Sequence, residues 1–125
     1  MICLDLGTHL HHLAFFLLQE EPTKVLANYN KFSKYNVVDD VDIILNYSNG
    51  IKGSMWLSKT AIGYRNGLQI EVYGSKASAL WHQENPEKVE FSYNTGQKII
   101  IDRGSDIEML PNKLYNRMTA GHPSG

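Results

Sequence analysis

One stretch decides the fold, and it reads Asp5-Leu6-Gly7-Thr8-His9-Leu10-His11-His12-Leu13-Ala14-Phe15-Phe16-Leu17-Leu18. Its leucines recur at intervals of four, three and four residues, at Leu6, Leu10, Leu13 and Leu17. On a period of about 3.6 residues these side chains form one stripe that faces a core. The sequence therefore predicts the main helix here, ending near Gln19, with Asp5 as its N-cap or first-turn acid.

The same stretch brings an acid and a base together. Asp5 and His9 are four residues apart, so on a helix their side chains stack on one face and are expected to touch. Histidine titrates near neutrality and suits proton transfer, and a neighbouring carboxylate orients it and stabilises its cation. The residues alone favour a plainer interpretation, in which Asp5 caps the helix and His9 lies at the core edge.

Composition limits what this pair can belong to. The chain has 125 residues, with 12 basic and 13 acidic side chains and a pI near 6.5, which fits one domain over residues 1–125 and disfavours nucleic-acid binding. A single cysteine, Cys3, fits a reducing compartment, so we expect a cytoplasmic protein. No apolar run is long enough to cross a bilayer, and we expect no membrane partner.

Alternating apolar and polar residues predict strands after the helix. The turn pair Asn49-Gly50 favours a tight type I′ hairpin, and Trp56 in the strand after it points away from the first core. The predicted strands span residues 23–33, 41–47, 51–61, 68–73, 77–82, 88–93 and 97–102.

One helix followed by strands predicts an α+β fold. We expect an open, mainly antiparallel (mixed) sheet of about six or seven strands with the N-terminal helix on one face. From Arg103 onward the apolar residues show neither helical nor strand spacing, and the sequence indicates a loop. A single helix covers only part of one sheet face, so something else must cover the rest.

Read together, these motifs resemble a known family, Gfo/Idh/MocA, which includes glucose-fructose oxidoreductase and inositol dehydrogenase. Leu4-Asp5-Leu6-Gly7-Thr8-His9 resembles the D-I-G-x-H signature at the start of the second domain of that family. Later landmarks follow in the same order, at Asn49-Gly50-Ile51-Lys52-Gly53-Ser54, at residues 65–76, at Leu80-Trp81 and at Gly121-His122-Pro123-Ser124-Gly125. The resemblance covers nearly the whole chain.

The resemblance implies the substrate-side domain of an NAD- or NADP-dependent oxidoreductase that acts on a sugar, sugar nucleotide or cyclitol. In such enzymes an N-terminal Rossmann domain holds the cofactor. This chain has no G-x-G-x-x-G after a strand and no Glu-Lys-Pro segment, so we expect a fragment that binds no cofactor and is inactive alone. Relatives pair through this sheet, which implies a homodimer or larger assembly.

The resemblance also assigns roles to residues. It implies that His9 is the catalytic base and Asp5 its partner, and that Thr8 and His122 contact the substrate. Arg65 and Lys59, cations near hairpin ends, are further candidates to contact a phosphate or carboxylate of the substrate, and plain solvation is the open alternative for both. A metal site is not expected, because His11 points away from His9 on a helix and no cysteine set accompanies them. The alternative is a non-catalytic sheet module for self-association or protein binding, in which Asp5 and His9 are only structural.

Overall fold

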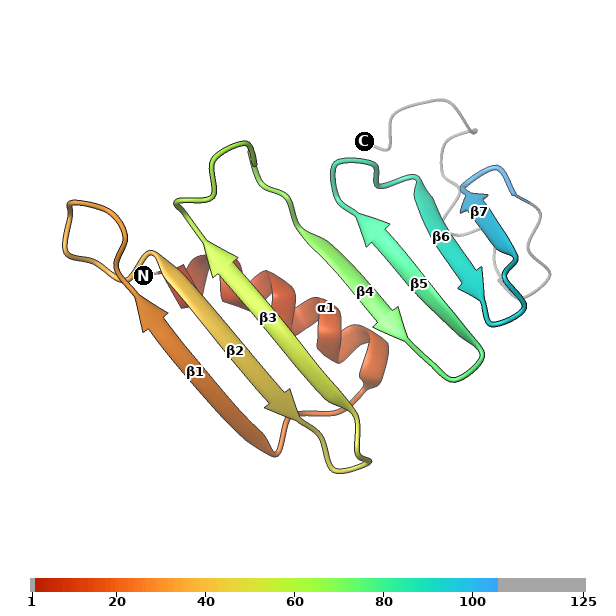
Figure 1. The fold of residues 1–125 in the computed structure, drawn as a ribbon, viewed down its shortest axis with the longest axis horizontal. Coiled ribbons are helices and arrows are strands. Elements are labelled where there is room, and N and C mark those ends of the chain that lie inside the picture. Colours follow the sequence, from red (N-terminus) through yellow and green to blue (C-terminus); the bar gives the residue numbers. More distant parts are fainter. Residues whose placement is uncertain (1, 106–125) are drawn as a thin grey trace. The chain divides into compact units, whose positions relative to one another are not determined.

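A computed structural model gives the fold of the chain and describes residues 2–105 (Figure 1). The contacts divide the chain into two compact units, one up to Tyr64 and one from Arg65 onward. The first unit contains the helix and a three-stranded sheet, and the second contains a four-stranded sheet. The predicted α+β class is confirmed, with seven strands that pair only in antiparallel fashion in the described part.

The helix begins earlier than predicted. A π-helical stretch, η1 (Cys3–Gly7), leads directly into the α-helix α1 (Thr8–Leu18). Asp5 therefore lies inside the helix as a first-turn acid, and the alternative prediction of an N-cap is wrong, because neither helical segment has a side-chain cap. The predicted end is confirmed, since Gln19 adopts a left-handed conformation and its N–H donates to the Phe15 carbonyl at 2.8 Å.

The π-helical stretch aligns the start of the helix with the core. Ile2, Leu6 and Leu10 are spaced by four residues, and in an unbroken α-helix two such steps would drift by about 80°. A π turn closes its hydrogen bonds over five residues, so it rotates less per residue and removes this drift. All three side chains consequently pack in one cluster with the buried strand residues Val41 and Leu57.

The end of the leucine stripe differs from the prediction. Leu17 is 47% exposed, because the buried cluster lies against the start of the helix rather than its last turn. The start of the helix also approaches the sheet, because a Cβ on Gly7 would lie 3.4 Å from Cδ1 of Leu57, which is van der Waals contact.

The three-stranded sheet has the order β1-β2-β3 and is covered on one face by the helix, which lies behind β3 in Figure 1. Alternation along β3 directs Leu57 into the core and leaves Trp56 on the other face, 55% exposed, as predicted. Two strands are shorter than predicted, β1 (Lys24–Asn30) and β3 (Lys52–Ser58). The strand β2 (Asp40–Asn46) has the predicted length but begins and ends one residue earlier.

The turn between β2 and β3 differs from the type I′ turn that the sequence predicts. Gly50 has a φ of +82°, whereas Asn49 does not have a positive φ. The N–H of Tyr47 donates to the Ile51 carbonyl at 3.0 Å, so three residues form the loop instead of two. Such a loop needs only one left-handed residue, which is the glycine.

The four-stranded sheet has the order β4-β5-β6-β7. Its strands are β4 (Gln69–Tyr73), β5 (Ala77–His82), β6 (Lys88–Tyr93) and β7 (Lys98–Asp102). The bounds predicted for β5 and β6 are confirmed, and β4 and β7 each begin one residue later than predicted. Within residues 2–105, no helix has the length and apolar character needed to cross a membrane.

Candidate active site at the start of the helix

Three of the predicted site residues lie together on the first turns of the helix. Asp5 is in η1, and Thr8 and His9 begin α1. All three side chains are exposed, so a bound molecule can reach them. The Thr8 hydroxyl donates to the Leu4 carbonyl at 2.8 Å, which uses its proton and leaves its oxygen to accept a hydrogen bond from a ligand.

The partner of Asp5 comes from the end of a strand. The ammonium nitrogen of Lys59 lies 2.6 Å from the Asp5 carboxylate, in a hydrogen bond that is also an ion pair. Sequence reasoning expected the imidazole of His9 to touch this carboxylate and did not connect Asp5 with Lys59. Strand alternation contains the signal, because Leu57 faces the helix and Lys59, two residues later, extends toward the same side.

Lys59 also sets the charge of Asp5. Its hydrogen bond and its positive charge hold the pKa of the Asp5 carboxyl below the usual range, against the opposing effect of burial. The electrostatic effect of His9 lowers this pKa further by a smaller amount. Asp5 is therefore an anion at neutral pH, and it interacts electrostatically with His9.

The structure does not test the other two predicted site residues, Arg65 and His122. Arg65 begins the second unit and is exposed in the segment between β3 and β4, so the structure does not place it with Asp5 and His9. His122 lies outside the described residues. Substrate contacts by both residues stay predictions.

The histidines of the helix do not gather with other metal ligands. His11 lies 3.4 Å from a carboxylate oxygen of Glu21, and it packs against the ring of Phe15 with the ring centroids 6.5 Å apart. In the part of the chain that the structure describes, no three His, Cys, Asp or Glu side chains lie close enough together to hold a metal ion.

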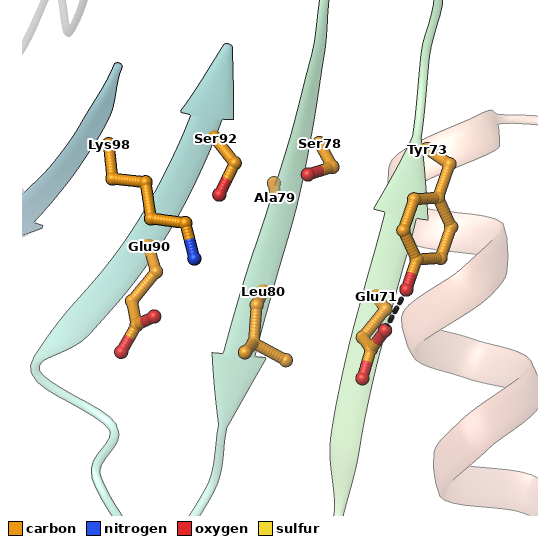
Figure 2. A pocket seen from close by; sticks show the side chains of 8 residues that line it. All are labelled: Glu71, Tyr73, Ser78, Ala79, Leu80, Glu90, Ser92 and Lys98. Carbon is orange, nitrogen blue, oxygen red and sulfur yellow. Dashed lines mark hydrogen bonds between the residues drawn. The ribbon is translucent and has the colours of Figure 1, made fainter. Parts of the chain in front are cut away.

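A second polar feature lies in the second unit. A hollow of about 180 Å³ lies on the four-stranded sheet, and Figure 2 shows the side chains that line it. The Tyr73 hydroxyl donates to the Glu71 carboxylate at one side of it, and this bond raises the pKa of Tyr73. Sequence reasoning did not single out this surface. It is lined by Glu71, Tyr73, Ser78, Ala79, Leu80, Glu90, Ser92 and Lys98.

The described residues do not fit a dinucleotide. Dinucleotide sites of the Rossmann type place a glycine-rich turn between a strand and the start of a helix, where backbone N–H groups bind the pyrophosphate. In residues 2–105 the helix precedes every strand, and the strands follow one another without a second helix. The described residues therefore contain no cradle of the Rossmann type for NAD or NADP.

Comparison with known proteins connects this arrangement to a family. Residues 1–80 match the GFO/IDH/MocA C-terminal domain. The chain belongs to this family. The matched region includes the helix with Asp5, Thr8 and His9 and the whole three-stranded sheet, so the family resemblance seen in the sequence is confirmed.

Proteins with similar sequences and structures are longer than this chain. An uncharacterized oxidoreductase, YfiI from Bacillus subtilis (strain 168), is 29% identical over 70% of this chain and 23% of its own length. An inositol dehydrogenase homolog from Azotobacter vinelandii, complexed with NAD+, is 28% identical with a TM-score of 0.90 over 99% of this chain and 33% of its own. An oxidoreductase from Pseudomonas syringae is 29% identical with a TM-score of 0.89, over 100% of this chain and 35% of its own. The chain thus spans about a quarter to a third of these relatives.

Proposed function

We propose that this chain is the substrate-side domain of an NAD- or NADP-dependent oxidoreductase that acts on a hydroxyl of a sugar, sugar nucleotide or cyclitol. In this proposal the two compact units act together as one substrate and oligomerisation domain. Membership of the GFO/IDH/MocA C-terminal domain family supports the oxidoreductase class. Complexes of the Azotobacter vinelandii homolog, one with NAD+ and one with NADH and myo-inositol, support the cofactor and the polyol class.

One observation carries the proposal: Asp5, Thr8 and His9 are exposed together on the first turns of one helix. Oxidation of a secondary alcohol removes a proton from the hydroxyl, and an imidazole is suited to accept it at neutral pH. His9 takes this proton in our proposal. The anionic Asp5 stabilises the imidazolium that forms, and the Thr8 oxygen accepts a hydrogen bond from a neighbouring substrate hydroxyl.

The cofactor belongs to another part of the enzyme in this proposal. When bound, the nicotinamide accepts the hydride that leaves the alcohol carbon. The residues described here orient the alcohol and hold its proton, and the dinucleotide is bound by a domain that this chain does not contain. We therefore propose that the chain alone is inactive.

The test is an activity screen on the complete enzyme, in which this chain is joined to its nucleotide-binding domain. Reduction of NAD+ or NADP+ is followed by absorbance with a panel of cyclitols, sugars and sugar nucleotides. Turnover of at least one polyol that is lost in His9→Ala and kept in His12→Ala supports the proposal. His12 is the matched control because it is also an exposed histidine on α1. Equal turnover in both variants contradicts it.

A second candidate function is supported by the uncovered face of the three-stranded sheet. Leu26, Ile44 and Trp56 all lie on that face and are 68%, 51% and 55% exposed. Exposed apolar patches mark interaction surfaces. A non-catalytic sheet module for self-association or protein binding would use this face, and in the enzyme proposal the same face joins two copies as a homodimer or larger assembly.

The proposed location is the cytoplasm. The single cysteine, Cys3, is free in the structure and partly exposed. A free, accessible thiol is typical of a reducing compartment, in which the nicotinamide cofactors of metabolism are also found.

A further inference from the structure

The Lys59 side chain joins the candidate site from a distant part of the sequence. Its ammonium nitrogen donates to Oδ2 of Asp5 at 2.6 Å, although 54 residues separate the two. Both side chains are about half exposed, at 48% and 57%. Ion pairs at this level of exposure contribute little to the stability of the fold. We therefore consider the effect of this contact on the position of the Asp5 carboxylate.

The backbone of Lys59 is held firmly in place. Its N–H donates to the Asp39 carbonyl at 2.8 Å, and Asp39 is only 5% exposed. The Asp39 carboxylate in turn accepts the N–H groups of Phe32 and Ser33 at 2.8 and 2.7 Å. The end of β3 is thus tied to a buried residue, and this restricts the positions that the Lys59 ammonium can reach.

The contact also determines how Asp5 can act on His9. A carboxylate on an exposed helical turn samples several rotamers unless a partner fixes it. Lys59 holds it at one oxygen, Oδ2, at 2.6 Å. His9 also acts electrostatically on this carboxylate.

We propose that Lys59 is a positioning residue of this site: it anchors the Asp5 carboxylate through Oδ2 so that the charge stays in a fixed place relative to His9. The inference rests on the proposed function, because it assigns Lys59 a role in the site that Asp5 and His9 form there. Lys59 itself does not take up or release the proton of the reaction.

The first test uses the 125-residue chain alone and needs no substrate. Carbon-13 NMR follows the titration of the Asp5 carboxyl in the wild type and in Lys59→Met, Lys59→Arg and Lys52→Met. We expect the Asp5 midpoint to rise toward the ordinary aspartate value in Lys59→Met and to stay low in Lys59→Arg. Lys52, an exposed lysine at the opposite end of β3, is the matched control and should leave the midpoint unchanged. An unchanged midpoint in Lys59→Met overturns the inference.

The second test measures kinetics in the complete enzyme. We expect Lys59→Met to lower kcat by about tenfold to a hundredfold, the order of effect of a misplaced catalytic group, with the KM for the dinucleotide unchanged. Lys59→Arg should restore most of the rate, and Lys59→Met should cost little more in an Asp5→Asn background. Lys59→Gln replaces Lys59→Met in both tests if the methionine variant does not fold.

The two proposals fail in different ways. If Asp5→Asn and His9→Ala lower kcat but Lys59→Met does not, the role of Lys59 is wrong and the proposed function stands. If none of the three substitutions lowers kcat in an enzyme that turns over a polyol, the site itself is wrong and Lys59 has no role in it.

Discussion

The indole N–H of Trp56 donates to the carboxylate of Asp40 at 2.9 Å, on the face of the three-stranded sheet that carries no helix. Asp40 is 5% exposed, and its other carboxylate oxygen accepts the side-chain amide of Asn30 at 3.0 Å. Burial alone would raise the pKa of Asp40, but hydrogen bonds from Asn30, Trp56 and Ser58 together keep it below the usual range. The face is therefore organised around a buried anion with an exposed aromatic ring above it.

Removing this anion should destabilise the sheet. Asp40→Ala leaves Trp56 without its acceptor and removes the shorter of the two hydrogen bonds of the Asn30 amide, which keeps its bond to Asp42 at 3.4 Å. We therefore expect a loss of about 1–2 kcal/mol in the free energy of unfolding. Urea denaturation measures it. Asp42→Ala, on the same strand and face but exposed, is the control and should change stability less. Equal losses in the two variants would contradict the role given to Asp40.

Acid should remove the contribution that the Asp39 carboxylate makes to stability. The N–H groups of Phe32 and Ser33 hold the pKa of Asp39 below its ordinary value of about 4. A carboxyl whose folded pKa is depressed adds stability above its unfolded pKa and loses it as the pH falls through the folded pKa. Asp39→Asn should therefore lower the urea midpoint at pH 7, with the difference from wild type shrinking as the pH falls well below 4. If the difference in urea midpoint between Asp39→Asn and wild type stays constant with pH, the negative charge of Asp39 does not contribute to stability.

Self-association should depend on Trp56. We expect at least a homodimer that buries the face with Leu26, Ile44 and Trp56, and Trp56→Ser should reduce the mass seen by light scattering. Tyr35→Ser is a matched control, because Tyr35 is 70% exposed but lies in the loop before β2. A wild-type chain that stays monomeric at high concentration argues against this interface.

The chain alone should not bind the cofactor. The described residues contain no phosphate cradle, so fluorescence titration of the 125-residue chain with NADH should show no saturable signal. No alcohol oxidation is expected from the chain in the presence of NAD+. Saturable binding of NADH would mean that residues of this chain form a nucleotide site by themselves.

The acid and base of the site should act as one unit. In the complete enzyme, His9→Ala should lower turnover by about a hundredfold to ten-thousandfold while cofactor affinity stays nearly constant. Asp5→Asn should cost less, because the imidazole remains, and the double variant should lose little beyond His9→Ala. Steady-state kinetics with the active polyol gives all three values. Multiplicative losses would mean that the two residues act independently.

The strands could be predicted from the sequence where local alternation decides the structure. The bounds of β5 and β6 follow directly from the alternation of apolar and polar residues between turn residues. The start of the helix could not be predicted in this way, because the capping preference of Asp5 is weaker than the packing of Ile2 in the core. The type I′ turn predicted at Asn49-Gly50 is also wrong. Asn49 tolerates a positive φ, but a three-residue loop needs a positive φ only at Gly50.

The candidate site was predictable only within one element. Spacing along a helix connects Asp5, Thr8 and His9, and the structure keeps these three together. The contact between Asp5 and Lys59 crosses from a helix to a strand end, so it depends on the packing of Gly7 on Leu57, which no local pattern encodes. Side-chain partners of this kind need the tertiary structure.

The π-helical stretch at Cys3–Gly7 makes this segment one residue longer than an ordinary α-helix of the same alignment needs. Loss of a single codon there would let an α-helix run through, and the seven steps then left from Ile2 to Leu10 would turn by about 700°, about 20° short of two full turns. Ile2 would therefore stay on the side of the helix that faces the core it shares with Leu10. We expect natural variation in this segment to include in-frame deletions of one residue as well as substitutions.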